Sequence, residues 1–116
     1  MSIRNLACVC YEVNRAICIA TGDESRFPWS YISELEQKST ISGIEFALEN
    51  PGASINSHHE AWMAYKIAEG WVWGVEKNEK LKTHPDLVPY DQLTLAKKTK
   101  YYVFRQTVFV LSKMVP

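Results

Sequence analysis

The sequence predicts a mainly α-helical fold of about four helices with one short two-stranded β-ribbon. In several segments apolar residues recur three and four positions apart, which is the spacing of an amphipathic helix. Turn-forming residues at 22–23 and 50–52 separate these segments, and only one short run, residues 71–75, is rich in β-prone side chains. With 116 residues, 47% of them hydrophobic, the chain is long enough for one core and too short for two domains.

The first predicted helix covers residues 3–21, where the apolar side chains form one stripe: Ile3, Leu6, Ala7, Cys10, Val13, Ile17 and Ala20. Gly22 follows it, as glycine commonly follows the last turn of a helix. Residues 23–29 are expected to form a loop, because Pro28 disfavours helical geometry at its predecessor. A second helix is expected over about residues 30–49, and its predicted buried residues are Ile32, Leu35, Ile44 and Leu48.

The third helix is predicted from a capping box, since residues 57–60 have the sequence S-x-x-E. It is expected to begin at Ser57, to run to about residue 69 and to end at Gly70. The β-prone run at 71–75 is expected to pair with a second extended piece around residues 87–90. A final helix over about 95–113 places Tyr101, Phe104, Val108 and Leu111 on one stripe. We therefore expect one domain over residues 1–116, with an N-terminal helical part (3–50) and a core motif (57–112).

The charge balance argues against a nucleic-acid partner, because thirteen basic and thirteen acidic residues cancel. Residues 1–50 carry four basic against seven acidic side chains, and residues 51–116 carry nine against six, so an anion site would draw its cations mainly from the second half. No apolar run approaches the ~20 residues that span a bilayer. The first five residues lack the layout of a signal peptide. We therefore expect a cytoplasmic protein without a membrane partner.

Three cysteines lie close together, at Cys8, Cys10 and Cys18. An odd number does not suit a disulfide framework, so we expect reduced thiols that pack in the core. Cys8 and Cys10 lie roughly 200° apart around a helix, which does not suit a shared metal ion. His58 and His59 are sequence neighbours and point in different directions, so no metal site is expected there either.

The motifs of several enzyme classes are missing from the sequence. It contains no glycine-rich phosphate loop, no G-x-S-x-G elbow and no H-E-x-x-H helix. It also offers no nucleophile beside a base and no obvious pair of carboxylates. We therefore expect a protein that is not an enzyme, with no catalytic residues and no cofactor.

The third helix indicates where a ligand would bind. At about 100° per residue, Trp62 lies about 60° from His59 and about 40° from Lys66, inside a polar arc that also contains Glu69. The expected core-facing arc on the opposite side consists of Ala61, Ala64, Tyr65 and Ala68. An indole beside an imidazole and a cation is suited to stacking a planar ring, with Lys66 available for a phosphate or carboxylate. The alternative is that Trp62 packs beneath the N-terminal region or against a dimer partner.

The N-terminal half contains further polar candidates. Asn14 lies at the edge of the apolar stripe, where it could fix an internal loop or line a pocket. Either role would spare it the cost of about 1–3 kcal/mol for an unpaired buried polar group. Arg15 faces away from the stripe. The loop at 22–25, together with Trp29, could likewise have a structural role or line a pocket.

The segment from His59 onward resembles the ryanodine-receptor repeat, the RyR domain. The family pattern H-E-x-W, then G-W-x-Y-G, then H-P-x-L-V-P-Y-x-x-L matches this sequence in order and spacing over about forty residues, at 59–62, 70–74 and 84–93. Residues 11–16, 22–25 and Trp29 also resemble the N-terminal part of stand-alone bacterial and phage proteins of this family. Two positions depart from the pattern: Trp73 replaces the tyrosine of G-W-x-Y-G, and Asp86 replaces a cysteine after His84-Pro85.

The resemblance implies a binding module for a nucleotide or a nucleotide-derived messenger. In the receptors two repeats form a pair, and an adenine nucleotide can lie between the tryptophans that match Trp62. A homodimer could rebuild such a pair here, or the N-terminal helices could replace the second repeat. We expect the base to stack on Trp62, with Trp73 or Trp29 beside it, while other side chains hold the anionic part: Lys66, His59, Arg15 and Asn14. The alternative function is a protein–protein interaction module with a tryptophan-centred interface.

Overall fold

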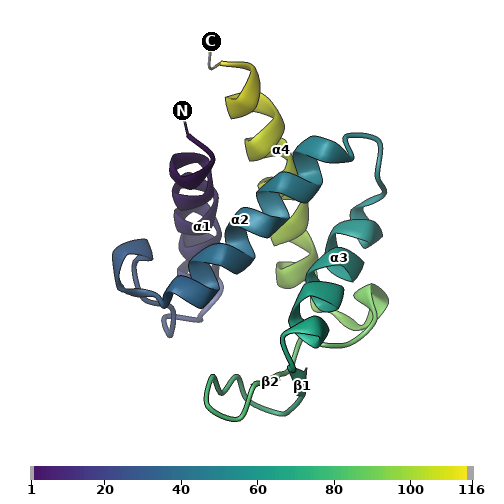
Figure 1. The fold of residues 1–116 in the computed structure, drawn as a ribbon. Coiled ribbons are helices and arrows are strands. Elements are labelled where there is room, and N and C mark those ends of the chain that lie inside the picture. Colours follow the sequence, from purple (N-terminus) through teal and green to yellow (C-terminus); the bar gives the residue numbers. More distant parts are fainter. Residues whose placement is uncertain (1, 115–116) are drawn as a thin grey trace.

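The computed structural model describes residues 2–114, which form four helices and a small sheet (Figure 1). The elements are α1 (Ile3–Ala20), η1 (Trp29–Tyr31), α2 (Glu34–Glu49), α3 (Ile55–Ala68), β1 (Val72–Trp73), β2 (Thr83–His84), η2 (Tyr90–Gln92) and α4 (Leu95–Lys113), where η denotes a 3₁₀ turn. α1 packs on α2 and α4, and α2 also packs on α3. Within these residues no helix has the length and apolarity to cross a membrane. The expected mainly α-helical fold with a short ribbon is confirmed.

Every helix begins after a serine or threonine whose hydroxyl oxygen accepts a hydrogen bond from an amide three residues on. These capping residues are Ser2, Ser33, Ser54 and Thr94. The bonds satisfy amides that have no partner within the helix. The cap of α3 is Ser54, so the predicted start at Ser57 is wrong by one turn. α2 likewise begins at Glu34, because residues 29–31 form η1 and Ser33 caps the helix that follows.

The hydrophobic core lies where α1, α2 and α4 meet. Its fully buried members are Leu6, Ala7, Cys10, Ile44, Ala47 and Val108. The prediction that Leu35 and Leu48 are buried is wrong, because the inward face of α2 passes through Ile44 and Ala47 instead. Ile32 is half-buried and precedes α2. All three cysteines are free thiols; Cys10 and Cys18 are buried and Cys8 is half-buried.

The sheet pairs β1 with β2 in parallel, with Val72 opposite Thr83 and Trp73 opposite His84. The expected pairing with residues 87–90 is wrong. That segment contains Pro89, which has no amide hydrogen to donate, and it leads directly into η2. The two strands approach so closely at Gly74 that a Cβ atom there would lie 2.5 Å from the Cβ of Thr83. The ribbon lies at the end of α3, away from both chain termini (Figure 1).

Candidate functional site

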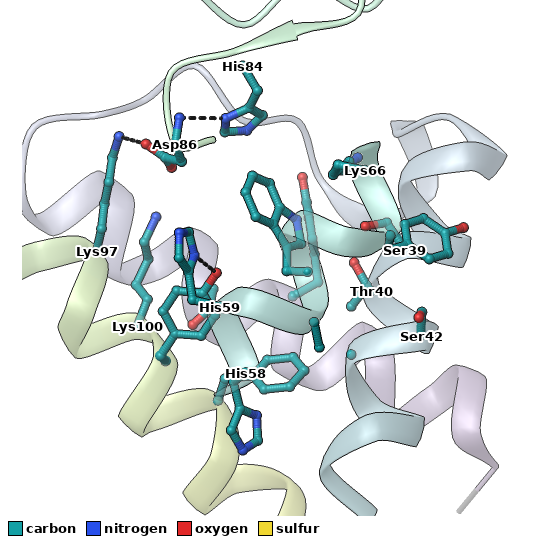
Figure 2. A pocket seen from close by; sticks show the side chains of 18 of the residues that line it. Ser39, Thr40, Ser42, His58, His59, Lys66, His84, Asp86, Lys97 and Lys100 are labelled. Atoms are coloured by element: carbon teal, nitrogen blue, oxygen red, sulfur yellow. Dashed lines mark hydrogen bonds and ion pairs between the residues drawn. The ribbon is translucent and has the colours of Figure 1, made fainter. Parts of the chain in front are cut away.

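A cavity of about 250 Å³ lies between the four helices and the segment that follows β2 (Figure 2). α4 contributes Lys97 and Lys100, which lie across the cavity from hydroxyl side chains of α2. Those hydroxyls belong to Ser39, Thr40 and Ser42. Aromatic and imidazole rings form much of the remaining wall: Tyr11, Phe46, His58, His59, Trp62, Tyr65, His84, Tyr101 and Phe104. The cavity therefore combines flat rings with cations and hydroxyls.

The inward face of α3 is the arc that the sequence analysis described as polar. His59 has no exposed surface and Lys66 is 5% exposed, whereas Ala64 and Ala68 are exposed. The expectation that the alanines face the core is therefore wrong at these two positions. These polar side chains can be buried because both line the cavity, His59 has hydrogen-bond partners on other segments, and the Lys66 ammonium lies over the Trp71 ring.

His59 joins three parts of the molecule. Its Nε2 lies 2.6 Å from the carbonyl oxygen of Val88, and its Nδ1 lies 2.6 Å from the hydroxyl of Tyr101 on α4. Because a carbonyl only accepts, Nε2 donates its hydrogen, and in the neutral ring Nδ1 accepts from the tyrosine. Burial raises the pKa of Tyr101, which keeps that hydroxyl protonated. With both ring nitrogens engaged, His59 is suited to positioning its neighbour Trp62.

Trp62 is half-buried and lies between two imidazoles. Its ring stacks on His59 with centroids 5.6 Å apart and meets His84 nearly edge to face at 4.9 Å. Burial lowers the pKa of His84 to about 4, so this ring is neutral at pH 7. In that state its Nδ1 accepts a hydrogen bond from the amide of Asp86 at 3.0 Å. The indole is therefore held between these two imidazole rings while it lines the cavity.

Five basic side chains line the cavity, and two of them are neutralised within it. Lys77 forms an ion pair with Glu36, and Lys97 forms one with Asp86. Burial by itself raises the pKa of Glu36, but the hydrogen bond and charge of Lys77 outweigh burial and the pKa is lowered. Asp86, which departs from the family pattern, thus has a defined partner on α4.

The other three cations have no carboxylate partner among residues 2–114: Arg26, Lys66 and Lys100. The Lys66 ammonium lies 4.6 Å from the centre of the Trp71 ring, and burial, assisted by the charge of Lys77, lowers its pKa. The Lys100 ammonium lies 3.3 Å from the Cys18 sulfur. A bound anion would pair with these cations and would favour the charged form of Lys66, whose pKa is lowered.

The structure brings together four of the seven predicted site residues. His59, Trp62, Lys66 and Asn14 line the cavity. That they bind a ligand stays a prediction.

The remaining three lie elsewhere. Trp73 is 56% exposed on β1. Trp29 packs against the core beside Tyr11, with ring centroids 5.7 Å apart. Arg15 extends toward Glu12, with 3.9 Å between the charged atoms, because it lies about 100° around α1 from Asn14.

The side chains that α2 and α4 contribute to the cavity were not predicted from the sequence. Ser39 and Ser42 lie three positions apart, as do Lys97 and Lys100, and this spacing places each pair on one helix face. A line of hydroxyls beside the apolar stripe of α2 was therefore a usable signal. Gly43 lies in the same stretch and allows close packing, since a Cβ there would be 3.3 Å from the Phe104 ring.

Comparison with known proteins places the second half of the chain in a family. No curated protein matches the sequence. A family model of the RyR domain matches residues 53–114, more than half of the chain. The matched segment supplies His59, Trp62, Lys66 and Lys100, whereas Asn14 and the α2 hydroxyls precede it. The chain therefore belongs to the RyR domain family.

Proposed function

We propose that this protein is a binding module for a nucleotide or a nucleotide-derived signalling molecule. The observation that supports the proposal is the presence of Trp62 in one cavity with three cations that have no carboxylate partner among residues 2–114. Small-molecule sites typically occupy about 300–1,000 Å³. The cavity, at about 250 Å³, therefore favours a single nucleotide over a dinucleotide.

The proposed binding mode uses two kinds of contact. The base stacks against Trp62, whose position is fixed by His59 and His84. The phosphate pairs with Lys66 and Lys100, where low exposure to water strengthens each charge-assisted hydrogen bond. Lys66 gains most, because it is buried over the Trp71 ring and has no carboxylate partner among residues 2–114.

Isothermal titration with ATP, ADP-ribose and a cyclic dinucleotide tests the proposal. Stacking on an aromatic side chain is worth about 1–3 kcal/mol, so Trp62→Ala should weaken binding by roughly tenfold or more. Trp73→Ala is the matched control, because it removes an exposed indole outside the cavity. The proposal fails if none of these ligands binds, or if Trp62→Ala binds as tightly as the parent.

The proposed activity is binding without chemical change of the ligand, in the cytoplasm. The location is supported by the three free thiols, a state typical of reducing compartments. Chromatography of nucleotides after prolonged incubation with the protein tests whether the ligand remains chemically unchanged. Recovery of the nucleotides unchanged supports it, and appearance of a product overturns it.

A second candidate function is self-association through the ribbon. Four large apolar side chains are exposed in and around it: Val72, Trp73, Val75 and Leu81. Exposed aromatic and aliphatic side chains of this kind often anchor protein interfaces. Sedimentation would detect a homodimer that Trp73→Ala dissociates and Trp62→Ala leaves intact. A parent protein that sediments as a monomer at high concentration contradicts this second candidate.

A further inference from the structure

We infer that Asn14 determines which ligands the cavity accepts, by accepting a hydrogen bond from an N–H group on the ligand's ring. The inference rests on the proposed function, because it names the chemistry that the same cavity would recognise. It concerns a residue of α1, outside the segment that the RyR family model matches.

The amide of Asn14 is incompletely bonded in the cavity wall. Its Oδ1 is fully buried and has no hydrogen-bond partner among residues 2–114. Folded proteins leave few buried acceptors in this state, because the group has lost water without gaining a replacement. Asn14 lines the cavity, so its amide lies beside the space that a bound molecule would occupy.

Several other acceptors of the cavity wall already have partners within the protein. The carboxylate of Glu36 pairs with Lys77, and that of Asp86 pairs with Lys97. His59 uses its two nitrogens on Val88 and Tyr101. The unpaired cations of the cavity are donors only. The Asn14 oxygen is therefore well placed to bond an N–H group of the ligand.

A second atom of the wall, Nε2 of His58, is also buried without a partner among residues 2–114. Burial lowers the pKa of His58, which leaves the ring neutral. Figure 2 shows His58 at the end of the cavity away from His84 and Asp86. Because a neutral imidazole can donate or accept, His58 tolerates several ligand groups, whereas the amide oxygen of Asn14 requires a donor.

These observations favour a nucleotide whose base presents an N–H group, such as the amino group of adenine. ATP and purine riboside triphosphate differ by that single amino group, so they isolate the hydrogen bond from stacking and charge. A site that bonds an N–H group rejects the analogue without it, because the protein acceptor is then left unpaired. We expect the parent protein to bind ATP about tenfold more tightly than purine riboside triphosphate.

Two leucine variants on α1 provide the matched comparison. Asn14→Leu keeps the approximate side-chain size and removes the acceptor, so it should weaken ATP binding about tenfold and bind both triphosphates equally. Asn5→Leu changes an exposed asparagine on the same helix, outside the cavity, and should leave both affinities unchanged. In the ligand-free protein, Asn14→Leu should not lower Tm, because it removes an unpaired polar group from a buried position. An asparagine that fixed an internal loop would give a lower Tm on substitution.

The outcomes separate this inference from the proposed function. Equal binding of the two triphosphates by the parent overturns the inference, and this comparison needs no variant that must fold. Discrimination that survives in Asn14→Leu also overturns it. If Trp62→Ala abolishes binding while Asn14→Leu does not, the proposed function stands without the inference. If neither triphosphate binds to the parent, both fail.

Discussion

At the level of single side chains, His84 illustrates how burial determines charge beside the candidate site. Its ring is 7% exposed, it contacts Trp62 and Trp71, and its Nδ1 accepts the Asp86 amide hydrogen. Protonation of Nδ1 would break that hydrogen bond and place a charge among cations, including Lys66 and Lys77. The same burial that holds Trp62 therefore makes this region sensitive to acid.

We predict that the free energy of unfolding falls as the pH drops from about 6.5 to about 4. The pKa of His84 is about 4 when folded and 6.5 ordinarily, so between these values the unfolded chain binds more protons. The loss reaches about 3 kcal/mol below pH 4, since each pKa unit is worth about 1.4 kcal/mol. The lowered pKa of His58 acts in the same direction.

Urea denaturation at pH 7 and at pH 4.5 measures this effect. His84→Asn keeps an acceptor near the Asp86 amide and cannot be protonated in this range, so its stability should fall less between the two pH values. An equal fall in the parent and in His84→Asn would show that other groups cause the pH dependence.

Gly74→Ala should destabilise the protein by about 1–3 kcal/mol, the usual cost of forcing extra atoms into a packed site. The added Cβ would lie 2.5 Å from the Thr83 Cβ, an atom fixed to the backbone of β2. Gly52→Ala is the control, since a Cβ at that position has no heavy atom within 4 Å. Chemical denaturation should show little change for Gly52→Ala, and comparable losses in the two variants would contradict the close approach of the strands.

At the level of elements, the start of α3 depends on Ser54. Ser54→Ala should cost about 1 kcal/mol, because it removes the acceptor for the Ser57 amide. Ser57→Ala should cost less, since the Ser57 hydroxyl is hydrogen-bonded to the Ser54 hydroxyl at 2.9 Å and caps no backbone amide among residues 2–114. Chemical denaturation of both variants tests the assignment. A larger loss for Ser57→Ala would place the helix start where the S-x-x-E pattern predicted it.

The sequence was sufficient to predict the elements but not the way their faces pack. Helix periodicity located α1 and α4 within one or two residues, because their apolar stripes are continuous. It assigned part of the inward face of α3 wrongly, because His58, His59 and Lys66 are buried there while Ala64 and Ala68 are exposed. Hydrophobicity alone cannot predict a polar interior, since such burial depends on partners from distant segments, as with His59 and Tyr101.

The candidate site was predictable only in part for the same reason. Trp62 and Lys66 share a face of one helix, and helix geometry places them together without further information. Arg26 and the α2 hydroxyls join them only through tertiary packing. The position of Trp73 outside the cavity also depends on tertiary structure, because its exposure follows from the pairing of β1 with β2.

At the level of the whole molecule, the core and the family match do not coincide. Five of the six fully buried core residues lie in α1 and α2, before the matched segment, and Val108 is the sixth. A fragment of residues 53–116 should therefore be largely unfolded, because it loses most of the apolar surface that α4 packs against. Circular dichroism of this fragment beside the full chain tests the prediction. A cooperative thermal transition in the fragment would contradict it.

The division of the cavity wall between two segments also bears on how such proteins diversify. α3, α4 and the ribbon region supply Trp62 and most of the cations, whereas α1 and α2 supply Asn14 and the hydroxyls. If the cavity binds the proposed ligand, substitutions in α1 and α2 would change which molecule is preferred while the half that matches the family keeps its sequence. Proteins grouped by that half alone would have a common scaffold and could still respond to different molecules.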